Sequence, residues 1–218
     1  MNFLFFFIGA SFGSFFMTAA ERGDSSVLSG RSHCVCGKTL QAWELIPVAG
    51  YILQGGKTHC GAKISPIYPV VETCAGLGML FLLRSGRALE ALFFLSLIFP
   101  TCEDIVRYEI HVLGLIPSFL IACYSASLHY FFLPAVVVIF FFAILSYLGG
   151  IGEGDVYVAG VIALFLGPNT LGAMLLTFLI GGAFALRMFL RGADRKAELP
   201  LVPFLLMGYV ASFWVSWI

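Results

Sequence analysis

Two aspartates stand at the edges of strongly apolar segments, where an ionisable side chain is costly to keep. Asp155 ends the sequence Gly-Glu-Gly-Asp, which begins at Gly152 and lies between two apolar runs. Asp104 ends an earlier apolar run and precedes a short polar stretch. Two carboxylates that share one proton can act together, one as general base on a water and the other as the acid that polarises a peptide carbonyl. Ionisable residues so close to apolar runs are therefore candidates for function.

The glycines beside Asp155 suit such chemistry. Because Gly152 and Gly154 have no side chain, backbone or an extended substrate can approach the carboxylate closely. A simpler explanation remains open, since acidic residues at helix ends also cap helices or face water. The other nearby carboxylates are interpreted as solvated loop residues: Glu103, Glu109 and Glu153.

The composition predicts a membrane protein. The 218 residues are 60% hydrophobic and only 11% charged, more apolar surface than a soluble domain of this size can bury. Unbroken apolar runs do not fit the alternating pattern of a transmembrane β-barrel. The zero net charge suggests no nucleic-acid partner. We therefore expect an all-α fold, a polytopic transmembrane helix bundle in a lipid bilayer.

The apolar runs predict about eight spans, with seven as the alternative, since a bilayer core of about 30 Å needs about 20 helical residues. The expected spans are 3–20, 67–83, 88–103, 111–128, 131–149, 156–167, 170–190 and 200–217. The long polar stretch 21–66 is predicted to form a loop subdomain. The expected domains are thus 1–20, a first transmembrane span, 21–66, the loop, and 67–218, a transmembrane core. No internal repeat is visible in the sequence.

The basic residues predict the orientation. If the loop 21–66 is cytoplasmic, ten of the 12 Lys and Arg lie inside and only Arg84 and Arg87 lie outside. The ten are Arg22, Arg31, Lys38, Lys57, Lys63, Arg107, Arg187, Arg191, Arg195 and Lys196. This asymmetry predicts an N-terminus outside, with Asp104 and Asp155 at the cytoplasmic side.

Several segments resemble the type IV prepilin peptidases, a family within the GxGD intramembrane aspartyl proteases. GEGDVY from Gly152 is similar to the family's Gly-x-Gly-Asp signature. DIVRYEIH from Asp104 is similar to its Asp-Leu-x-x-x-x-Ile-Pro segment, with His111 where Pro is usual. Further similar segments are GSFFMTAAER from Gly13, ISPIYPVVE from Ile64 and LPLVPFL from Leu199. These matches follow the family's order from the first predicted span to the last.

The resemblance implies an enzyme, a prepilin leader peptidase of the aspartic class, with Asp104 and Asp155 as its catalytic dyad. It implies cleavage of type IV prepilins or pseudopilins after a glycine, at the cytoplasmic face of the bacterial inner membrane. It also implies an N-methyltransferase that uses S-adenosylmethionine on the new N-terminus. The sequence has no glycine-rich cofactor fold, so no cofactor-binding residues are assigned.

The resemblance also bears on a metal. Family members commonly carry two Cys-x-x-Cys pairs in the cytoplasmic loop, a thiolate set suited to structural zinc. Here the loop holds Cys34, Cys36 and Cys60. His33 keeps the Cys-x-x-Cys spacing to Cys36, and a second histidine, His59, adjoins Cys60. A mixed site of Cys34, Cys36, Cys60 and His33 is one hypothesis; a metal-free loop of reduced thiols is the other.

Two further classes of function stay open. A proton- or cation-coupled membrane transporter would use the same two aspartates to bind its ion. A non-catalytic scaffold for a secretion or pilus machine would need neither aspartate. The long loop and the lack of visible inverted repeats favour the peptidase over the transporter.

Overall fold

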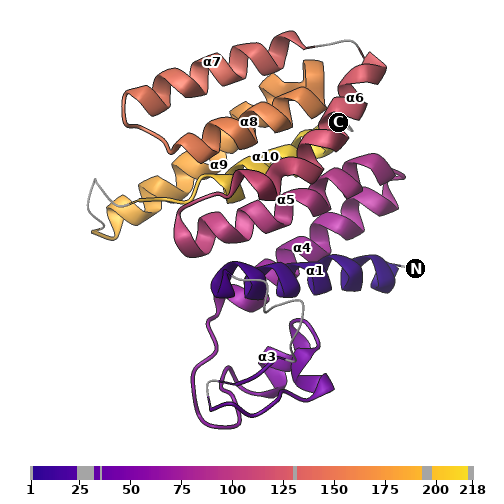
Figure 1. The fold of residues 1–218 in the computed structure, drawn as a ribbon, viewed down its shortest axis with the longest axis vertical. Coiled ribbons are helices and arrows are strands. Elements are labelled where there is room, and N and C mark those ends of the chain that lie inside the picture. The colour runs from indigo at the N-terminus through magenta and orange to yellow at the C-terminus, as the bar shows by residue number, and fades with distance from the viewer. Residues whose placement is uncertain (1, 24–31, 35, 130–131, 193–197, 216–218) are drawn as a thin grey trace. The chain divides into compact units, whose positions relative to one another are not determined.

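The computed structural model describes residues 2–23, 32–34, 36–129, 132–192 and 198–215 (Figure 1). Three of the basic residues counted for the orientation, Arg31, Arg195 and Lys196, lie outside these described residues. Within the described ranges, helices dominate and the only β pairing consists of two isolated bridges. The predicted all-α class is therefore confirmed.

Helices of 14 residues or more lie at all eight predicted spans in the described part of the chain. They are α1 (Asn2–Arg22), α4 (Ile67–Arg84), α5 (Ala88–Arg107), α6 (Ile116–His129), α7 (Leu133–Tyr147), α8 (Glu153–Leu166), α9 (Thr170–Leu190) and α10 (Val202–Val215). The shorter elements are η1 (Ala42–Leu45), α3 (Ala49–Leu53), η2 (Val112–Leu115) and η3 (Gly167–Asn169).

Not all of these helices are long enough to cross a bilayer unaided. Three described runs are long and apolar enough to do so: Asn2–Arg22, Ile67–Arg84 and the stretch Glu153–Leu190 that joins α8 to α9. Shorter apolar helices occupy Val112–Leu128, Leu133–Tyr147 and Val202–Trp214. These lengths and compositions agree with a helical membrane bundle.

The chain forms two compact units, Met1–Cys102 and Glu103–Ile218, and α5 runs from the first into the second. The three-part domain division expected from the sequence stays a prediction. Both predicted aspartates belong to the second unit, whereas the thiol-rich loop belongs to the first.

In the first unit, α1 packs along α4 through glycines (Figure 1). Gly9 and Gly13 form a small-xxx-small pattern on α1. A Cβ at Gly9 would clash with the carbonyl oxygen of Ala75 and would lie 2.7 Å from Cγ of Met79. Such patterns let helix backbones approach closely in membranes. The glycines of α1 therefore fix the contact between the first two long helices.

The polar loop of the first unit is tied to α4 by a buried carboxylate. Glu72 is 6% exposed, and its Oε2 accepts the backbone N–H of Val48 at 2.6 Å. Val48 has φ +64°, a strained conformation for a β-branched residue. Nearby, the Tyr68 hydroxyl donates to Oε2 of Glu21 at 2.6 Å, which joins the start of α4 to the end of α1.

In the second unit, α8 is the central helix. Nine of its 14 residues are buried, and it contacts α6, α7 and α10. Figure 1 shows α7 running alongside α8, and α9 packs against α10. A Cβ at Gly160 would lie 2.6 Å from Cγ1 of Ile139, so α7 and α8 approach closely through this glycine. The first turn of this buried helix carries Asp155.

Candidate functional site

Asp155 lies in the first turn of α8, where its own carboxylate helps to start the helix. Gly152, the residue that caps α8, is extended with φ −71° and ψ 152°. Its N–H donates to Oδ2 of Asp155 at 3.1 Å, which is the side-chain-to-backbone half of a capping box. The side chain is buried, with 8% of the residue exposed. A carboxylate in this place interacts favourably with the positive end of the helix dipole.

Asp104 lies near the end of α5 and meets the start of another helix. Its Oδ2 accepts the backbone N–H of Val202 at 2.9 Å. Val202 is the first residue of α10, so this N–H has no carbonyl partner within its own helix. Asp104 is 6% exposed. Each aspartate thus binds a free backbone donor at a helix N-terminus, Asp155 at α8 and Asp104 at α10.

The two aspartates have similar surroundings. Both belong to the second unit and both are buried. Two carboxylates buried close together cannot both ionise cheaply, so a state with one of them protonated is favoured. This arrangement is capable of acid–base chemistry on a water molecule.

The two glycines of the motif have different surroundings. A Cβ at Gly154 would lie 2.9 Å from Cδ1 and 3.0 Å from Cβ of Ile110. A Cβ at Gly152 would meet only Oδ2 of Asp155, at an ordinary 3.4 Å. The residue packed against Gly154 thus comes from the segment that follows Asp104.

The interpretation of Glu103 as a solvated loop residue is wrong. Glu103 is only 3% exposed. Because α5 continues through Arg107, Glu103 lies within the helix, on its buried side, and not in a loop. Its carboxylate contacts His111, which has 57% of its side chain exposed. Glu109 and Glu153 are exposed, as the sequence predicts. Pattern reasoning missed the Glu103–His111 contact because nothing in the sequence marks where α5 ends.

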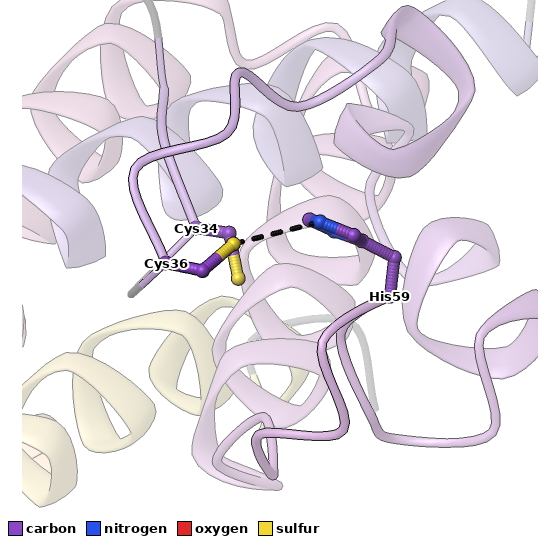
Figure 2. Close-up of side chains that lie close together, drawn as sticks. All are labelled: Cys34, Cys36 and His59. Carbon is purple, nitrogen blue, oxygen red and sulfur yellow. Dashed lines mark hydrogen bonds between the residues drawn. The ribbon is translucent and has the colours of Figure 1, made fainter.

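The thiol-rich loop brings potential metal ligands together (Figure 2). Cys34, Cys36 and His59 place their ligand atoms within 4.8 Å of one another. Cys36 Sγ lies 3.5 Å from Nε2 of His59, and Cys34 Sγ lies 3.1 Å from Sγ of Cys60. In Figure 2 the two cysteines of one turn lie opposite the histidine of another. His33 belongs to no such group in the described part of the chain and stays a prediction as a ligand.

These ligands come from two turns of the same construction, at 33–39 and 57–63. An antiparallel bridge closes each turn, between His33 and Thr39 and between Lys57 and Lys63. In the first turn the N–H of Cys34 donates to the carbonyl of Lys38, and the N–H of Gly37 donates to the carbonyl of Cys34. In the second turn Thr58 donates to Ala62 and Gly61 donates to Thr58 in the same way, and all four distances are 2.8 Å. The glycines, Gly37 and Gly61, have φ +82° and +84°. The structure therefore contains a local repeat that the sequence analysis did not find, although Cys-Gly at 36–37 and again at 60–61 is its signature.

Cys34, Cys36 and His59 fit a small metal ion, and Cys60 lies beside Cys34. Zinc bonds of about 2.3 Å to sulfur and 2.0–2.1 Å to nitrogen place tetrahedral ligand atoms roughly 3.5–3.8 Å apart. The Cys36–His59 distance of 3.5 Å lies in that range, and the 3.1 Å between Cys34 and Cys60 needs only a small opening. Hydrogen bonds, chiefly with Thr58 and then with Cys34, lower the pKa of the exposed Cys60 thiol to about 6. A thiolate is the form of cysteine that binds metal.

The fold and site define a class: an all-helical membrane protein with a buried carboxylate pair and a thiol-rich polar loop. Residues 7–85 match the family model of the bacterial peptidase A24 N-terminal domain. A prepilin leader peptidase/N-methyltransferase of Bacillus subtilis (strain 168) is 30% identical over 229 residues, which cover 96% of this chain and 92% of the relative. A prepilin leader peptidase/N-methyltransferase of Burkholderia pseudomallei (strain 1026b) is 29% identical, over 89% of this chain and 72% of the relative. The chain belongs to the prepilin leader peptidase/N-methyltransferase family, which confirms the resemblance.

Two other comparisons limit the interpretation. A prepilin leader peptidase/N-methyltransferase of Pseudomonas putida is 44% identical, but over 69 residues, 30% of this chain. No solved structure matches the chain significantly. None of the relatives reported is named as a transporter, so the transporter hypothesis has no support from them.

Proposed function

We propose that this protein is an aspartic endopeptidase that removes the leader of type IV prepilins or pseudopilins. Cleavage would follow a glycine, and Asp104 and Asp155 would be the catalytic dyad. The observation that carries this proposal is the pair of buried carboxylates, each bound to the N–H of a helix N-terminus. Membership of the peptidase family supplies the substrate class.

The mechanism needs one proton on the pair. The ionised carboxylate takes a proton from a water, whose oxygen attacks the carbonyl carbon of the scissile bond. The protonated carboxyl donates to the carbonyl oxygen, which becomes a hydroxyl of the tetrahedral intermediate. The C–N bond then breaks as the carboxyl that took the water's proton passes it to the leaving amine, while a hydroxyl of the intermediate returns a proton to the other carboxylate; no covalent enzyme intermediate forms. The N–H groups of Gly152 and Val202 each hold one oxygen of their aspartate, so the carboxyl groups are fixed before substrate binds.

The reaction would take place at the cytoplasmic face of the bacterial inner membrane, with the N-terminus outside. The distribution of Lys and Arg supports this orientation. The polar loop would face the same side and hold the basic leader, while the apolar segment of the substrate would lie among the helices. The peptide around the scissile bond must unwind there, because a helical peptide bond is shielded from attack.

Exchange of each aspartate for its amide tests the proposal. Asp104→Asn and Asp155→Asn should abolish leader cleavage of a co-expressed prepilin while the protein stays in the membrane. Glu153→Gln, two residues from Asp155 and exposed, is the matched control and should cleave normally. Mass spectrometry of the prepilin reads the cleavage position directly. Full cleavage by either Asn variant would refute the dyad.

The loop would hold a structural zinc ion through Cys34, Cys36, Cys60 and His59. Bound zinc would join the two turns and stabilise the loop without taking part in hydrolysis. Metal analysis of the purified protein should find near-stoichiometric zinc, which Cys34→Ser removes. Cys123→Ser, in α6 and remote in sequence from the loop, should leave the zinc content unchanged. Wild-type protein without zinc would refute the site.

The second activity proposed is N-methylation of the new N-terminus with S-adenosylmethionine as methyl donor. Its support is the name that the relatives share, prepilin leader peptidase/N-methyltransferase. We assign no residues to this cofactor. The same mass spectrum that reads the cleavage position also reads the methyl group, and a mature product without it would refute this half of the proposal.

A further inference from the structure

Glu103, the residue directly before Asp104, is a buried carboxylate that binds a single partner through both oxygens. Its Oε2 accepts the backbone N–H of His111 at 3.3 Å, and its Oε1 lies 2.7 Å from Nδ1 of the same imidazole. With 3% of the residue exposed, Glu103 is more buried than either aspartate of the proposed dyad. An unpaired carboxylate in such a place is strongly unfavourable. His111 therefore provides the hydrogen bonds that make Glu103 tolerable.

The contact closes a sharp turn of the chain. After α5 ends at Arg107, the N–H of Tyr108 donates to the carbonyl of Asp104 at 3.1 Å. Tyr108 has φ +56°, a conformation that non-glycine residues rarely adopt. His111 then caps η2. A strained turn persists only where the surrounding contacts hold it, and the bonds from Glu103 to His111 span it from end to end.

The residue between Tyr108 and His111 that faces the Gly-Glu-Gly-Asp motif is Ile110. Its Cδ1 would lie 2.9 Å from a Cβ at Gly154, so the isoleucine packs directly on the backbone of the glycine. Gly154 immediately precedes Asp155. The turn that begins at Asp104 therefore ends by packing against the motif that carries the other aspartate.

We infer that Glu103 and His111 form a positioning pair for the dyad; this inference rests on the proposed function. By holding the turn 108–111 against α5, the pair sets where Ile110 presses on Gly154. That contact sets the spacing between the helix ends that carry Asp104 and Asp155. In this role Glu103 and His111 take no part in the chemical step. They act on the geometry of the two carboxyl groups.

This chain departs from the related family at the same place. The similar segment of the family has Pro where this chain has His111. The backbone of His111, with φ −78°, would accept a proline ring. Proline, however, has no N–H and no imidazole, so His111→Pro would leave both oxygens of Glu103 without their partners. His111 and the buried Glu103 are thus a matched set in this chain.

Four proteins test the pair: wild type, His111→Pro, Glu103→Met, and the variant with both changes. Methionine has nearly the length of glutamate and needs no hydrogen bond. His111→Pro should lower kcat for leader cleavage by about 10- to 100-fold with little change in KM, because a shift approaching 1 Å at a catalytic group costs up to about 100-fold. Adding Glu103→Met should restore most of kcat. Glu109→Gln, exposed in the same loop, is the control and should behave as wild type.

Hydrogen exchange gives a readout that does not depend on activity. The His111 amide donates to Glu103, so Glu103→Met should speed its exchange, while amides within α9 should not change. A wild-type kcat in His111→Pro would overturn the inference, and so would a double variant no better than His111→Pro. If wild type itself fails to cleave any prepilin, the proposed function fails instead. Unchanged exchange at His111 would then show separately that the pair does not hold the turn.

Discussion

Gly154→Ala is the smallest change that should disturb the proposed dyad. The added methyl carbon would lie 3.0 Å from Cβ of Ile110, and no side-chain rotation can move that atom because it is bonded to the backbone. Carbon atoms prefer separations of 3.5–4.0 Å, so the turn 108–111 must move by about 0.5–1 Å. A displacement of this size beside Asp155 should lower kcat by roughly 10- to 100-fold.

The stability of the same variant should change far less than its activity. Overpacking costs about 1–3 kcal/mol, whereas alanine is favoured over glycine inside a helix by roughly 0.5–1 kcal/mol. The two effects oppose each other, so the net loss should be no more than about 2 kcal/mol. A variant that folds, inserts and melts nearly like wild type but cleaves slowly is the expected result.

The assay follows conversion of a prepilin by purified protein in detergent, with thermal unfolding measured in parallel. Gly150→Ala, two residues before the motif, is the matched control, because its methyl carbon would meet only the carbonyl oxygen of Leu145 at 3.4 Å. It should retain most of the wild-type rate. Equal rates for Gly154→Ala and wild type would refute the steric reasoning. Equal losses in both alanine variants would show that the packing of Ile110 is not the cause.

Three further predictions concern other parts of the fold. Gly9→Ala should destabilise the packing of α1 on α4 by about 1–3 kcal/mol, seen as a lower Tm in detergent, whereas Gly182→Ala in α9, with nothing within 4 Å, should not lower it. Glu72→Leu leaves the N–H of Val48 without its acceptor and should speed limited proteolysis of the loop; Glu72→Gln keeps an acceptor oxygen and should change it less. In metal-free protein, alkylation of Cys60 by iodoacetamide should reach half its maximal rate near pH 6, since its pKa is lowered to about 6 and the thiolate that reacts is present above that pH. A midpoint near the usual thiol pKa of about 8.5 would contradict the hydrogen bonding described for this thiol.

The positions of the long helices follow directly from the apolar runs. Lipid offers the backbone no hydrogen bonds, so a long apolar run is stable there as a helix. The ends were harder to predict, because they depend on local contacts. The span expected from 111 begins as the 3-10 turn η2, and α6 starts only at Ile116. The span expected to end at 103 continues to Arg107, and this extension is what buries Glu103.

The partners of the site residues could not be predicted, because they lie far apart in the sequence. Spacing within one turn pointed to His33, yet the imidazole beside Cys36 is that of His59, 23 residues away. Asp104 was recognisable as a carboxylate beside an apolar run. Its hydrogen bond to Val202 depends on how α10 packs, which no local pattern records.

The bond between Asp104 and Val202 also has a consequence for how the protein is made. The two residues are 98 positions apart, so the contact cannot form until the ribosome has released the start of α10. Chains interrupted before that point contain both aspartates but lack the donor that holds one of them. If that donor is needed for hydrolysis, a nascent chain stays inactive while its earlier helices enter the membrane. Proteolytic competence would then arise only as α10 docks.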